Sequence, residues 1–493
     1  MNLSKSLYTI GIQCPKALWL KKYKPEVLTP TDEFSQAKFD TGHTVGELAC
    51  SLFPNGIKID FNSNLEQMVK KTKELIDSGI STIYEAAFYF ENILVIVDIL
   101  EITSEGFFIY EVKSSTSIKD IYLHDISIQY YTLEKLGMSV KGASLVYLNS
   151  NYVRDNELNL KELFVIEDVT KTVKSFQEVI PTNLQCFNSY LEDKNNEPNI
   201  DIGKQCKNPY ECLAINYCWK IQRNISDYSI FDIFNLGSKK QIELYNQGII
   251  NINDIPSDFD MTTNQQTAVN SYKSKETYID KIAIKEYLKT LTYPIYYLDF
   301  ETYQQAIPQF KGLSPYEQIA FQYSLHIEYE DGTLEHKEFL AEDGFDSRYD
   351  FAKSLVENIP SNVTVLAYNM SFEKSVIRKL ANLYGEFTYD LMNIHNNIQD
   401  LMLPFQKKWY ITSSMQGSYS IKYVLPSLVP EFEKAYKDLE LVHNGSEAMS
   451  VYANLKNLSN AEKIVYKKAL LEYCKLDTLA MVRILEVLRR TKI

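Results

Sequence analysis

The sequence predicts an α/β protein in which a helical connector joins two α/β domains. Its 493 residues exceed the roughly 250–300 residues beyond which a single hydrophobic core stops growing. Two long stretches alternate apolar strands with amphipathic helices, and a stretch of short amphipathic helices separates them. We therefore expect domains at residues 1–222 and 292–493, with the helical connector at residues 223–291.

The first domain is expected to open with a helix, followed by a Lys/Glu-rich helix at Glu66–Ser78 and then by strands. The segment NILVIVDILEITSEGFFIYEVKSS contains two apolar strands joined through Thr103–Gly106, which predicts a β-hairpin. If the loop is centred between Ser104 and Glu105, two acidic residues lie equally far from the turn on the two strands.

These two residues, Asp98 and Glu111, are then cross-strand neighbours with Cβ atoms about 5 Å apart. Lys113, two residues after Glu111, points to the same face. Such charges on an apolar sheet are costly to bury unless they bind a cation and one another. Mg²⁺ takes carboxylate, water and phosphate oxygens, and a nearby ammonium can hold the attacking water. The alternative is a solvent-facing strand edge with salt-bridged charges.

Short motifs of the first domain follow in the order QCPKALWL, TGHTVGE, VDIL, EVK and IQYYTLEKL. Residues 1–220 thereby resemble the RecB-like branch of the PD-(D/E)XK nucleases, in particular the iron–sulfur members associated with CRISPR systems. The resemblance implies a restriction-endonuclease-like αβ fold and a divalent-metal site. It implies these site residues: metal ligands His43, Asp98 and Glu111, the catalytic lysine Lys113, and Gln129 with Tyr130 or Tyr131 to steady the site.

Three cysteines form the evenly spaced pattern C-x5-C-x5-C in CKNPYECLAINYCW. Seven cysteines in a chain of this size without an export signal favour reduced thiols, so a cluster of them is expected to bind metal. The resemblance implies that a distant N-terminal cysteine joins these three to hold a [4Fe–4S] cluster. The implied ligands are Cys14, Cys206, Cys212 and Cys218. Zn²⁺ is one alternative, because four thiolates suit tetrahedral zinc; uncoordinated buried thiols are another. The unclustered cysteines are expected to be packing residues: Cys50, Cys186 and Cys474.

The second domain is expected to begin with the apolar strand PIYYLDFET, followed by a strand pair around Phe321–Phe339 and the strand VTVLAY. The chain then ends in an amphipathic helix. Ser459 and Glu462 form an S-x-x-E capping box at the start of that helix.

Two pairs of polar residues share a face on these elements. Asp299 and Glu301 stand at positions i and i+2 of the apolar strand. Tyr473 and Asp477 stand at positions i and i+4 of the final helix. Between them, LAYNMSFEKSVIRKLA turns from strand to helix and supplies Asn369, Phe372 and Glu373. D-x-E and Y-x3-D also occur by chance, so the interpretation depends on the ordered set.

This D-x-E, N-x-x-F-E and Y-x3-D series resembles the DnaQ-like DEDD 3′–5′ exonucleases of the tyrosine subtype, over residues 293–493. The resemblance implies an RNase H-like mixed sheet with flanking helices. It implies a two-metal site with Tyr473 beside the attacking water and these ligands: Asp299, Glu301, Glu373 and Asp477. The family usually has Asp where this chain has Glu373, so Asp400 in NIQDLM is the alternative ligand.

The net charge of −13 counts against nucleic acid as a partner. However, residues 1–25 contain five lysines and no carboxylate, and residues 463–493 carry eight Lys or Arg against three acids. Local basic surfaces are therefore expected. The chain has no GxxxxGK[ST] loop, which argues against an NTP-driven motor. An N-terminus without a signal-peptide layout and the lack of a long apolar stretch predict a cytoplasmic protein that does not enter the membrane.

Together these features predict a nuclease that depends on Mg²⁺ or Mn²⁺ and has two active sites, with DNA as the expected substrate. The whole arrangement resembles uncharacterised bacterial RecB-like proteins fused to an RNase H-like domain. The alternatives are a nucleic-acid-binding protein with degenerate sites, and a protein with one active exonuclease site and an N-terminal cluster-bearing clamp.

Overall fold

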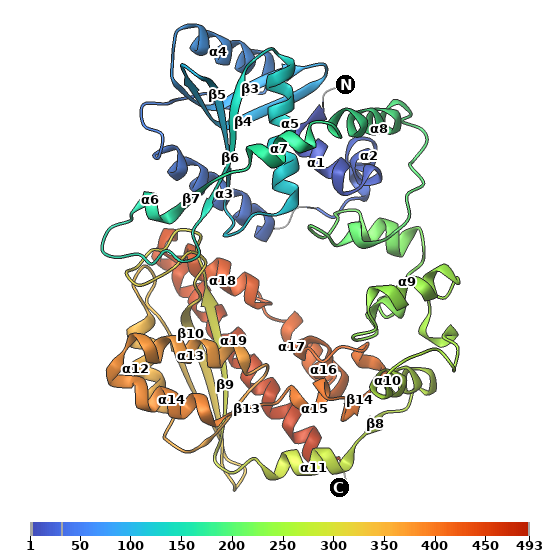
Figure 1. Ribbon diagram of the computed structural model, residues 1–493. Helices are drawn as coiled ribbons and strands as arrows, with labels where there is room; N and C mark the ends of the chain where they lie inside the picture. Colours follow the sequence, from blue (N-terminus) through green and yellow to red (C-terminus); the bar gives the residue numbers. More distant parts are fainter. Residues whose placement is uncertain (1–2, 31–32, 492–493) are drawn as a thin grey trace. The chain divides into compact units, whose positions relative to one another are not determined.

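A computed structural model describes residues 3–30 and 33–491 of the chain. Helices and mixed β-sheets occur together along the chain, so the predicted α/β class is confirmed (Figure 1). None of the helices in the described ranges combines the length and the apolarity that crossing a lipid bilayer requires.

The chain divides into two compact units. The first comprises Met1–Asn224 and Gln305–Glu317, and the second comprises Ile225–Gln304 and Gln318–Ile493. Nearly all of the predicted connector, residues 223–291, groups with the second unit.

Seven described strands of the first unit form one mixed sheet in the order β2-β3-β4-β5-β6-β7, with β1 beside β4. β3, β4 and β5 are antiparallel neighbours, β6 is parallel to β5, and β7 is antiparallel to β6. The strands are β1 (Leu3–Ser4), β2 (Ile57–Lys58), β3 (Thr82–Phe90), β4 (Ile93–Thr103), β5 (Gly106–Lys113), β6 (Val140–Leu148) and β7 (Phe164–Asp168).

The β4–β5 hairpin has the register predicted from the sequence. Ile99 is paired with Tyr110, and Thr103 with Gly106. One further step along this register sets Asp98 against Glu111, because the two strands run antiparallel. The hairpin prediction is therefore confirmed.

Helices of the first unit pack on this sheet around one large core (Figure 1). α5 contacts β3, β4 and β6, and it also packs against α1 and α7. The helices are α1 (Lys5–Gln13), α2 (Pro15–Tyr23), α3 (Glu33–Cys50), α4 (Leu65–Asp77), α5 (Asp120–Lys135), α6 (Leu160–Leu163), α7 (Thr170–Phe176) and α8 (Ile180–Glu192).

A proline separates α1 from α2 and fixes the residue between them. Ser4 caps α1, since its side chain accepts a hydrogen bond from the N–H of Leu7. Pro15 begins α2, and the residue before a proline is disfavoured in the helical conformation. Cys14 is accordingly extended, with φ −161° and ψ 114°. Its thiol therefore lies at a break between two helices.

The second unit contains a five-stranded mixed sheet in the order β11-β10-β9-β12-β13 and a small β14–β8 ribbon. β10 is antiparallel to β9 and β11, whereas β12 is parallel to β9 and β13. The strands are β8 (Tyr278–Ile279), β9 (Ile295–Tyr303), β10 (Ile319–Glu328), β11 (Leu334–Leu340), β12 (Thr364–Ala367), β13 (Ile398–Asp400) and β14 (Tyr410–Ile411).

The long C-terminal helix α19 packs against β9, β10 and β11. Its predicted capping box is confirmed, because Ser459 and Glu462 make both reciprocal hydrogen bonds. The helices of the second unit are α9 (Ser238–Asn246), α10 (Thr263–Ser274), α11 (Lys281–Lys289), α12 (Arg348–Asn358), α13 (Ser371–Leu383), α14 (Thr388–Asn397), α15 (Leu403–Gln406), α16 (Ile421–Leu428), α17 (Glu431–Lys437), α18 (Gly445–Asn454) and α19 (Asn460–Arg490).

Candidate functional site

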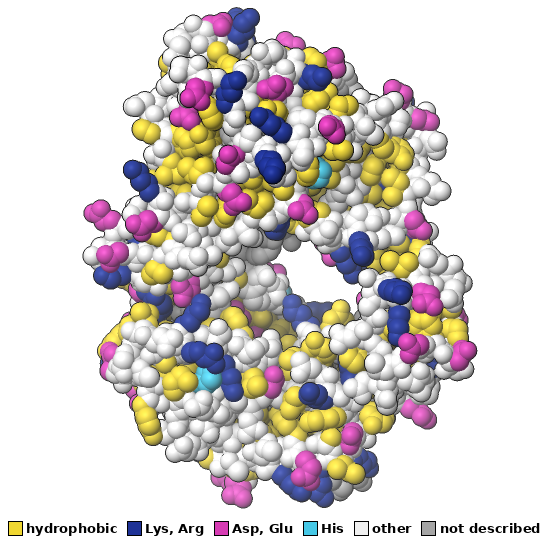
Figure 2. All heavy atoms as spheres, viewed as in Figure 1, with side chains coloured by type: hydrophobic (Ala, Val, Ile, Leu, Met, Phe, Trp, Pro, Cys, Tyr) yellow, Lys and Arg dark blue, Asp and Glu magenta, His cyan; other side chains and the backbone are white. Residues whose placement is uncertain are grey.

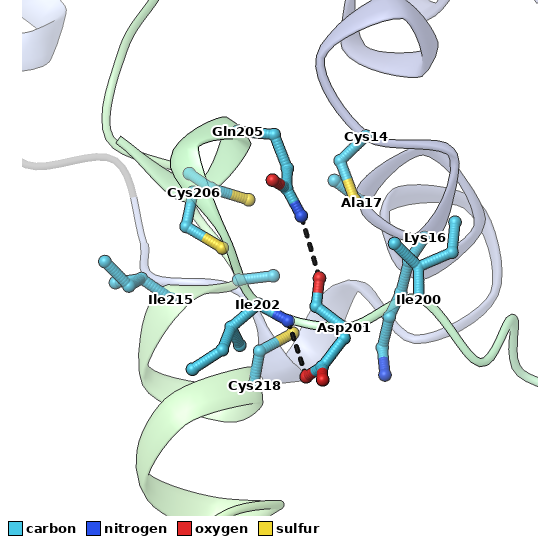
Figure 3. Close-up of a pocket in the computed structure, with 12 residues that line it drawn as sticks. Cys14, Lys16, Ala17, Ile200, Asp201, Ile202, Gln205, Cys206, Ile215 and Cys218 are labelled. Atoms are coloured by element: carbon cyan, nitrogen blue, oxygen red, sulfur yellow. Dashed lines mark hydrogen bonds between the residues drawn. The ribbon is translucent and has the colours of Figure 1, made fainter. Parts of the chain in front are cut away.

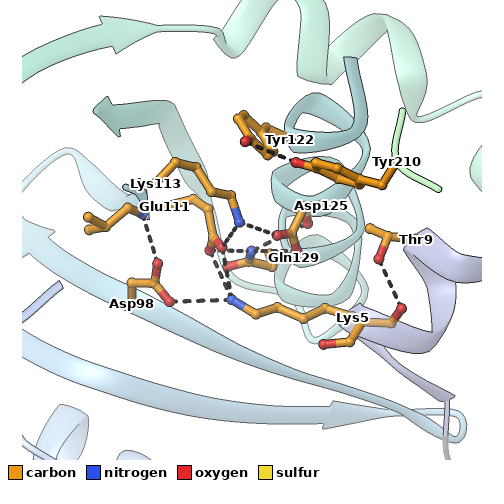
Figure 4. Close-up of polar contacts among 11 residues, drawn as sticks. Lys5, Thr9, Asp98, Glu111, Lys113, Tyr122, Asp125, Gln129 and Tyr210 are labelled. Carbon is orange, nitrogen blue, oxygen red and sulfur yellow. Dashed lines mark hydrogen bonds and ion pairs between the residues drawn. The ribbon is translucent and has the colours of Figure 1, made fainter. Parts of the chain in front are cut away.

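The first candidate site lies on the β4–β5 hairpin, where Asp98 and Glu111 come together (Figure 4). The N–H of Val112 donates a 2.7 Å hydrogen bond to Asp98 Oδ2, which fixes this carboxylate against the neighbouring strand. The side chain of Glu111 is 2% exposed and that of Asp98 is 23% exposed. Burial, together with the charge of Glu111, raises the pKa of Asp98 to about 7. Asp98 is therefore costly to keep ionised.

Side chains from β5 and α5 compensate Glu111. Lys113 Nζ lies 2.7 Å from Glu111 Oε1 and 2.6 Å from Asp125 Oδ2. Gln129 Nε2 donates to Glu111 Oε2 over 2.7 Å. Burial by itself would raise the pKa of Glu111, but Lys113 and Lys5 hold it well below its usual range. The structure thus brings Glu111, Lys113 and Gln129 together and adds Asp125, which sequence reasoning missed.

A second lysine enters this site from the N-terminal end of α1. Lys5 Nζ lies 3.3 Å from Asp98 Oδ1 and 3.0 Å from Glu111 Oε2. Figure 4 shows its side chain reaching toward both carboxylates. Sequence reasoning missed Lys5, because 93 positions separate it from Asp98 and no motif marks it.

The neighbouring tyrosines of α5 do not share the role of Gln129. The hydroxyl of Tyr130 donates to the carbonyl of Val140 over 3.2 Å. The Lys135 ammonium lies 5.3 Å from the ring centre of Tyr131. Of the residues predicted to steady the site from α5, Gln129 alone has a hydrogen bond to Glu111 among the described contacts.

His43, a predicted metal ligand, does not join the two carboxylates. It lies on α3 with an exposed side chain and has no hydrogen bond or ion pair with Asp98 or Glu111 in the described part of the chain. Its charge instead acts on Glu47 and Glu85. From the sequence alone, a single histidine in a helix does not show whether it lies on the face turned toward the site. The predicted ligand set therefore comes together as Asp98 and Glu111 without His43.

Glu85 of β3 stands opposite Asp98 in the strand register. Strands β3 and β4 pair Tyr84 with Ile99 and Ala86 with Val97, but the intervening residues, Glu85 and Asp98, do not form a regular pair. Glu85 has φ +58°, a conformation that side chains with a Cβ rarely adopt. It also interacts electrostatically with Lys5 and Glu111. Strain of this kind concentrates at functional sites, which makes Glu85 a further candidate oxygen donor.

The four predicted cysteine ligands line one pocket of the first unit (Figure 3). Cys14 comes from the break between α1 and α2, whereas the other three come from the segment after α8. The N–H of Cys212 donates to the carbonyl of Cys206 over 2.9 Å, which folds this segment back on itself. Burial raises the pKa of the Cys212 thiol to about 11, and nearby thiols add to the effect.

Hydrogen bonds hold the N-terminal helices against the cysteine segment. Gln13 Nε2 donates to the carbonyls of Gln205 and Tyr210, each over 2.8 Å. Lys16 Nζ lies 2.9 Å from a carboxylate oxygen of Glu197. These contacts cross almost 200 positions of sequence and position Cys14 beside Cys206, Cys212 and Cys218.

The second candidate site is a cluster of acids at β9 and α19. One oxygen each of Asp299, Glu301 and Asp477 can be chosen so that all lie within 4.8 Å of one another. Burial and the neighbouring acids raise the pKa of Glu301 to about 8 and raise that of Asp299 well above its ordinary value. None of the three has a salt bridge with a lysine or arginine in the described part of the chain. Buried carboxylates that lie close together without a salt bridge bind protons or a metal cation.

Glu373 lies near this cluster at the start of α13. It is 2% exposed, and its Oε2 has no hydrogen-bond partner in the structure. Its charge raises the pKa values of Asp299 and Glu301. Asp400 is used differently, because its Oδ1 accepts hydrogen bonds from the N–H groups of Asn369 and Met402 over 3.0 and 2.9 Å. Glu373 is therefore the better candidate for a fourth ligand.

Two tyrosines and a cysteine complete the surroundings of Asp477. Tyr473 interacts with Asp477 as its helical spacing predicts, and Tyr436 of α17 donates a 2.5 Å hydrogen bond to Asp477 Oδ1. Cys474 Sγ lies 3.8 Å from Asp299 Oδ2, so this thiol packs directly on the acids. Sequence reasoning missed Tyr436 and gave Cys474 a packing role only. Neither has a motif that links it to the acidic residues.

A pocket of about 360 Å³ opens beside Asp477 and Tyr473. Its wall includes apolar residues of α16 and α17 and two lysines, Lys422 and Lys437. Burial raises the pKa of Asp477 to about 6, although hydrogen bonds from Tyr436 and Tyr473 and the charge of Lys422 oppose this effect. The site therefore combines buried oxygen donors, a cation and an adjoining pocket.

Without divalent metal, the second unit should lose stability as pH rises from about 5 to about 8.5. The pKa values of Glu301 and Glu373 are about 8, against an ordinary 4.5. Between these values the folded state binds more protons than the unfolded state, so rising pH favours unfolding; below about pH 4 both states are protonated and the effect ends. Mg²⁺ or Mn²⁺ should restore stability at pH 8.5 by replacing the protons. Thermal melting followed by circular dichroism, with metal or with EDTA, measures both effects.

The matched control is the double variant Asp299→Asn, Glu301→Gln. It removes two of the acids with little change in shape, so its melting temperature should depend less on pH and respond less to metal. Equal responses of this variant and the wild type would show that the cluster is not their source.

The chain is similar to a domain family of unknown function and to two proteins that are described as uncharacterized. A family model described as a domain of unknown function (DUF2779) matches residues 296–420, a range that holds Asp299, Glu301 and Glu373. The chain is 27% identical to the uncharacterized protein UU173 of Ureaplasma parvum over 242 residues, 46% of this chain and 34% of the relative. It is 24% identical to the uncharacterized protein MG366 of Mycoplasma genitalium over 404 residues, 72% of this chain and 60% of the relative. The chain therefore spans less than two thirds of the length of either relative.

Proposed function

We propose that this protein is a metal-dependent nuclease with two active sites, one in each unit, and that it hydrolyses phosphodiester bonds in DNA. The observation that carries the proposal is the buried cluster Asp299, Glu301 and Asp477, whose oxygens lie within metal-ligand reach of one another. Such a cluster is costly to bury unless a cation compensates it. Divalent metals bound by carboxylates are a recurrent means of hydrolysing phosphodiesters.

The second site would act as a DnaQ-like 3′–5′ exonuclease. Asp299, Glu301 and Asp477, with Glu373, would hold Mg²⁺ or Mn²⁺, and the unpartnered Oε2 of Glu373 fits such a role. The bound ions would supply an activated water and charge stabilisation at the leaving oxygen. Tyr473 would orient the attacking water through its hydroxyl. The mixed sheet with flanking helices is compatible with the proposed RNase H-like fold.

The first site would act as a RecB-like nuclease on a restriction-endonuclease-like domain. Asp98 and Glu111 offer oxygens to a divalent metal, and Lys113 would hold a phosphate oxygen or the attacking water. The ion pair of Lys113 with Asp125 supports this role, because it fixes the ammonium beside Glu111.

The cysteine pocket would hold a [4Fe–4S] cluster. A tetrahedral zinc with Zn–S bonds of about 2.3 Å draws its sulfurs to about 3.8 Å from one another. The acidic cluster is the only described group of three or more possible ligands within 4.8 Å, so no three cysteine sulfurs lie that close. Thiolates of a four-iron cluster stay farther apart, because each binds a different iron. Zinc bound by the same four thiolates is the alternative.

DNA is proposed as the substrate, with metals rather than a broad basic surface supplying most of the phosphate affinity. On the face shown in Figure 2, Lys and Arg side chains are interspersed with Asp and Glu. This distribution agrees with the net charge of −13. The free thiols are compatible with a cytoplasmic location, which we propose.

A second candidate function is a single exonuclease whose first unit is a cluster-bearing clamp. The contacts of Lys5 with Asp98 and Glu111 favour it, because an ammonium can neutralise these carboxylates without a metal. The activity tests below separate the two candidates.

Anaerobically purified protein should be brown and should lose its visible absorption on reduction, because four thiolates hold iron and sulfide. Cys212→Ser should lose colour and thermal stability together. Cys186→Ser is the matched control, since Cys186 is exposed on α8 outside the pocket. A colourless wild-type protein with one equivalent of zinc would contradict the iron assignment.

Asp98→Asn should abolish one nuclease activity and Asp299→Asn the other, each by at least about a hundredfold, because metals supply much of the transition-state stabilisation. The assay uses end-labelled single- and double-stranded DNA and RNA with Mg²⁺ or Mn²⁺. Asp258→Asn, at an exposed position, is the control. If Asp299→Asn alone removes all cleavage, the first unit is a clamp.

The second site should trim DNA from 3′ ends. In the Asp98→Asn variant, a 5′-labelled oligonucleotide should give a ladder of products shortened one nucleotide at a time. A covalently closed circle should remain intact in the same reaction, and internal cutting of that circle would rule out the proposed polarity.

A further inference from the structure

Lys5 completes an unusual pattern in the first candidate site: every carboxylate oxygen of Asp98 and Glu111 already has a hydrogen-bond donor. Asp98 Oδ1 accepts from Lys5, and Asp98 Oδ2 accepts from the N–H of Val112. Glu111 Oε1 accepts from both lysines, and Glu111 Oε2 accepts from Lys5 and Gln129. The Lys5 ammonium bridges Asp98 and Glu111, so a metal ion shared by these two carboxylates would compete with it for the space between them.

Of these donors, Lys5 is the one that a metal displaces at least cost. Val112 donates through the backbone of β5, and Gln129 is fully buried on α5. Lys113 keeps Asp125 as a second partner. The described ion pairs of Lys5 are with Asp98 and Glu111 alone, and its side chain is 20% exposed, so its ammonium can turn toward water.

We propose that Lys5 is an internal cation that competes with the divalent metal for Asp98 and Glu111 and thereby sets the metal affinity of the first site. The inference rests on the proposed function of that site. The ammonium and the metal need the same oxygens and repel each other, so they do not occupy them together. Lys5 acts through the metal ligands and is a positioning residue.

The helix that carries Lys5 is anchored at its other end. Gln13, the last residue of α1, binds two carbonyls of the cysteine segment, and Cys14 follows it in the cysteine pocket. The α1 backbone is therefore held while the Lys5 side chain exchanges between the carboxylates and solvent. Competition then requires only a change of side-chain rotamer.

The test measures metal binding directly in the full chain. The second site is silenced with Asp299→Asn and Glu301→Gln, and Mn²⁺ binding is followed by the electron paramagnetic resonance signal of free Mn²⁺. Lys5→Met keeps the length of the side chain without its charge and should bind Mn²⁺ about tenfold more tightly. Lys5→Arg keeps the charge and should bind with the affinity of the parent protein.

Lys71→Met is the matched control, because the exposed Lys71 pairs with Glu74 on α4 and has no described contact with Asp98 or Glu111. It removes one positive charge from the same unit and should leave Mn²⁺ affinity unchanged. Circular dichroism of each variant checks folding.

Equal affinities of the parent protein, Lys5→Met and Lys5→Arg would overturn the inference while leaving the metal site in place. Tighter binding in Lys71→Met as well would also overturn it, because the loss of any positive charge would then explain the change. If no protein in the series binds Mn²⁺, both the inference and the proposed function of the first site fail. Weaker binding by Lys5→Met would show that Lys5 supports the metal instead of competing with it.

Discussion

The free-energy cost of removing carboxylates from water applies at both candidate sites. The two units compensate this cost in different ways. In the first unit, Lys5 and Lys113 lie against Glu111, whose pKa falls well below its usual range. In the second unit, Asp299 and Glu301 have no ion pair among the described residues, and their pKa values rise. The surrounding sheets are apolar, so neither set of charges is neutral to stability. The first set is partly compensated by lysines of the chain, and the second is left to protons or a cation.

Helix α1 connects the hairpin site with the cysteine pocket inside the first unit. Its first residue, Lys5, contacts the hairpin carboxylates, and its C-cap, Cys14, lines the pocket. The nine residues of this helix form a rigid segment, because backbone hydrogen bonds join its successive turns. The backbone that carries Lys5 is therefore joined through α1 to the cysteine segment. If a cluster binds there, as proposed, its role extends beyond local stability.

Sequence reasoning succeeded where local geometry determines the outcome. The hairpin register followed from the loop position and brought Asp98 against Glu111. The periods of strand and helix placed Asp299 with Glu301, and Tyr473 with Asp477. It failed where contacts depend on tertiary packing. Asp125, Tyr436 and Lys5 approach the acids from separate elements without any motif, and the helical position of His43 left its face undetermined.

The buried carboxylates of the two units are compensated differently, and this difference would affect how each site binds metal. At the first site, three carboxylates face two ammonium groups, so a divalent ion has to replace an existing ion pair. At the second, burial raises the pKa of Asp477 despite the opposing effects of Tyr436, Tyr473 and Lys422, and the pKa values of the neighbouring acids are raised as well. A metal there displaces protons rather than a lysine. Low pH would therefore oppose metal binding at the second site, whereas at the first site the proposed competitor is a lysine of the chain itself.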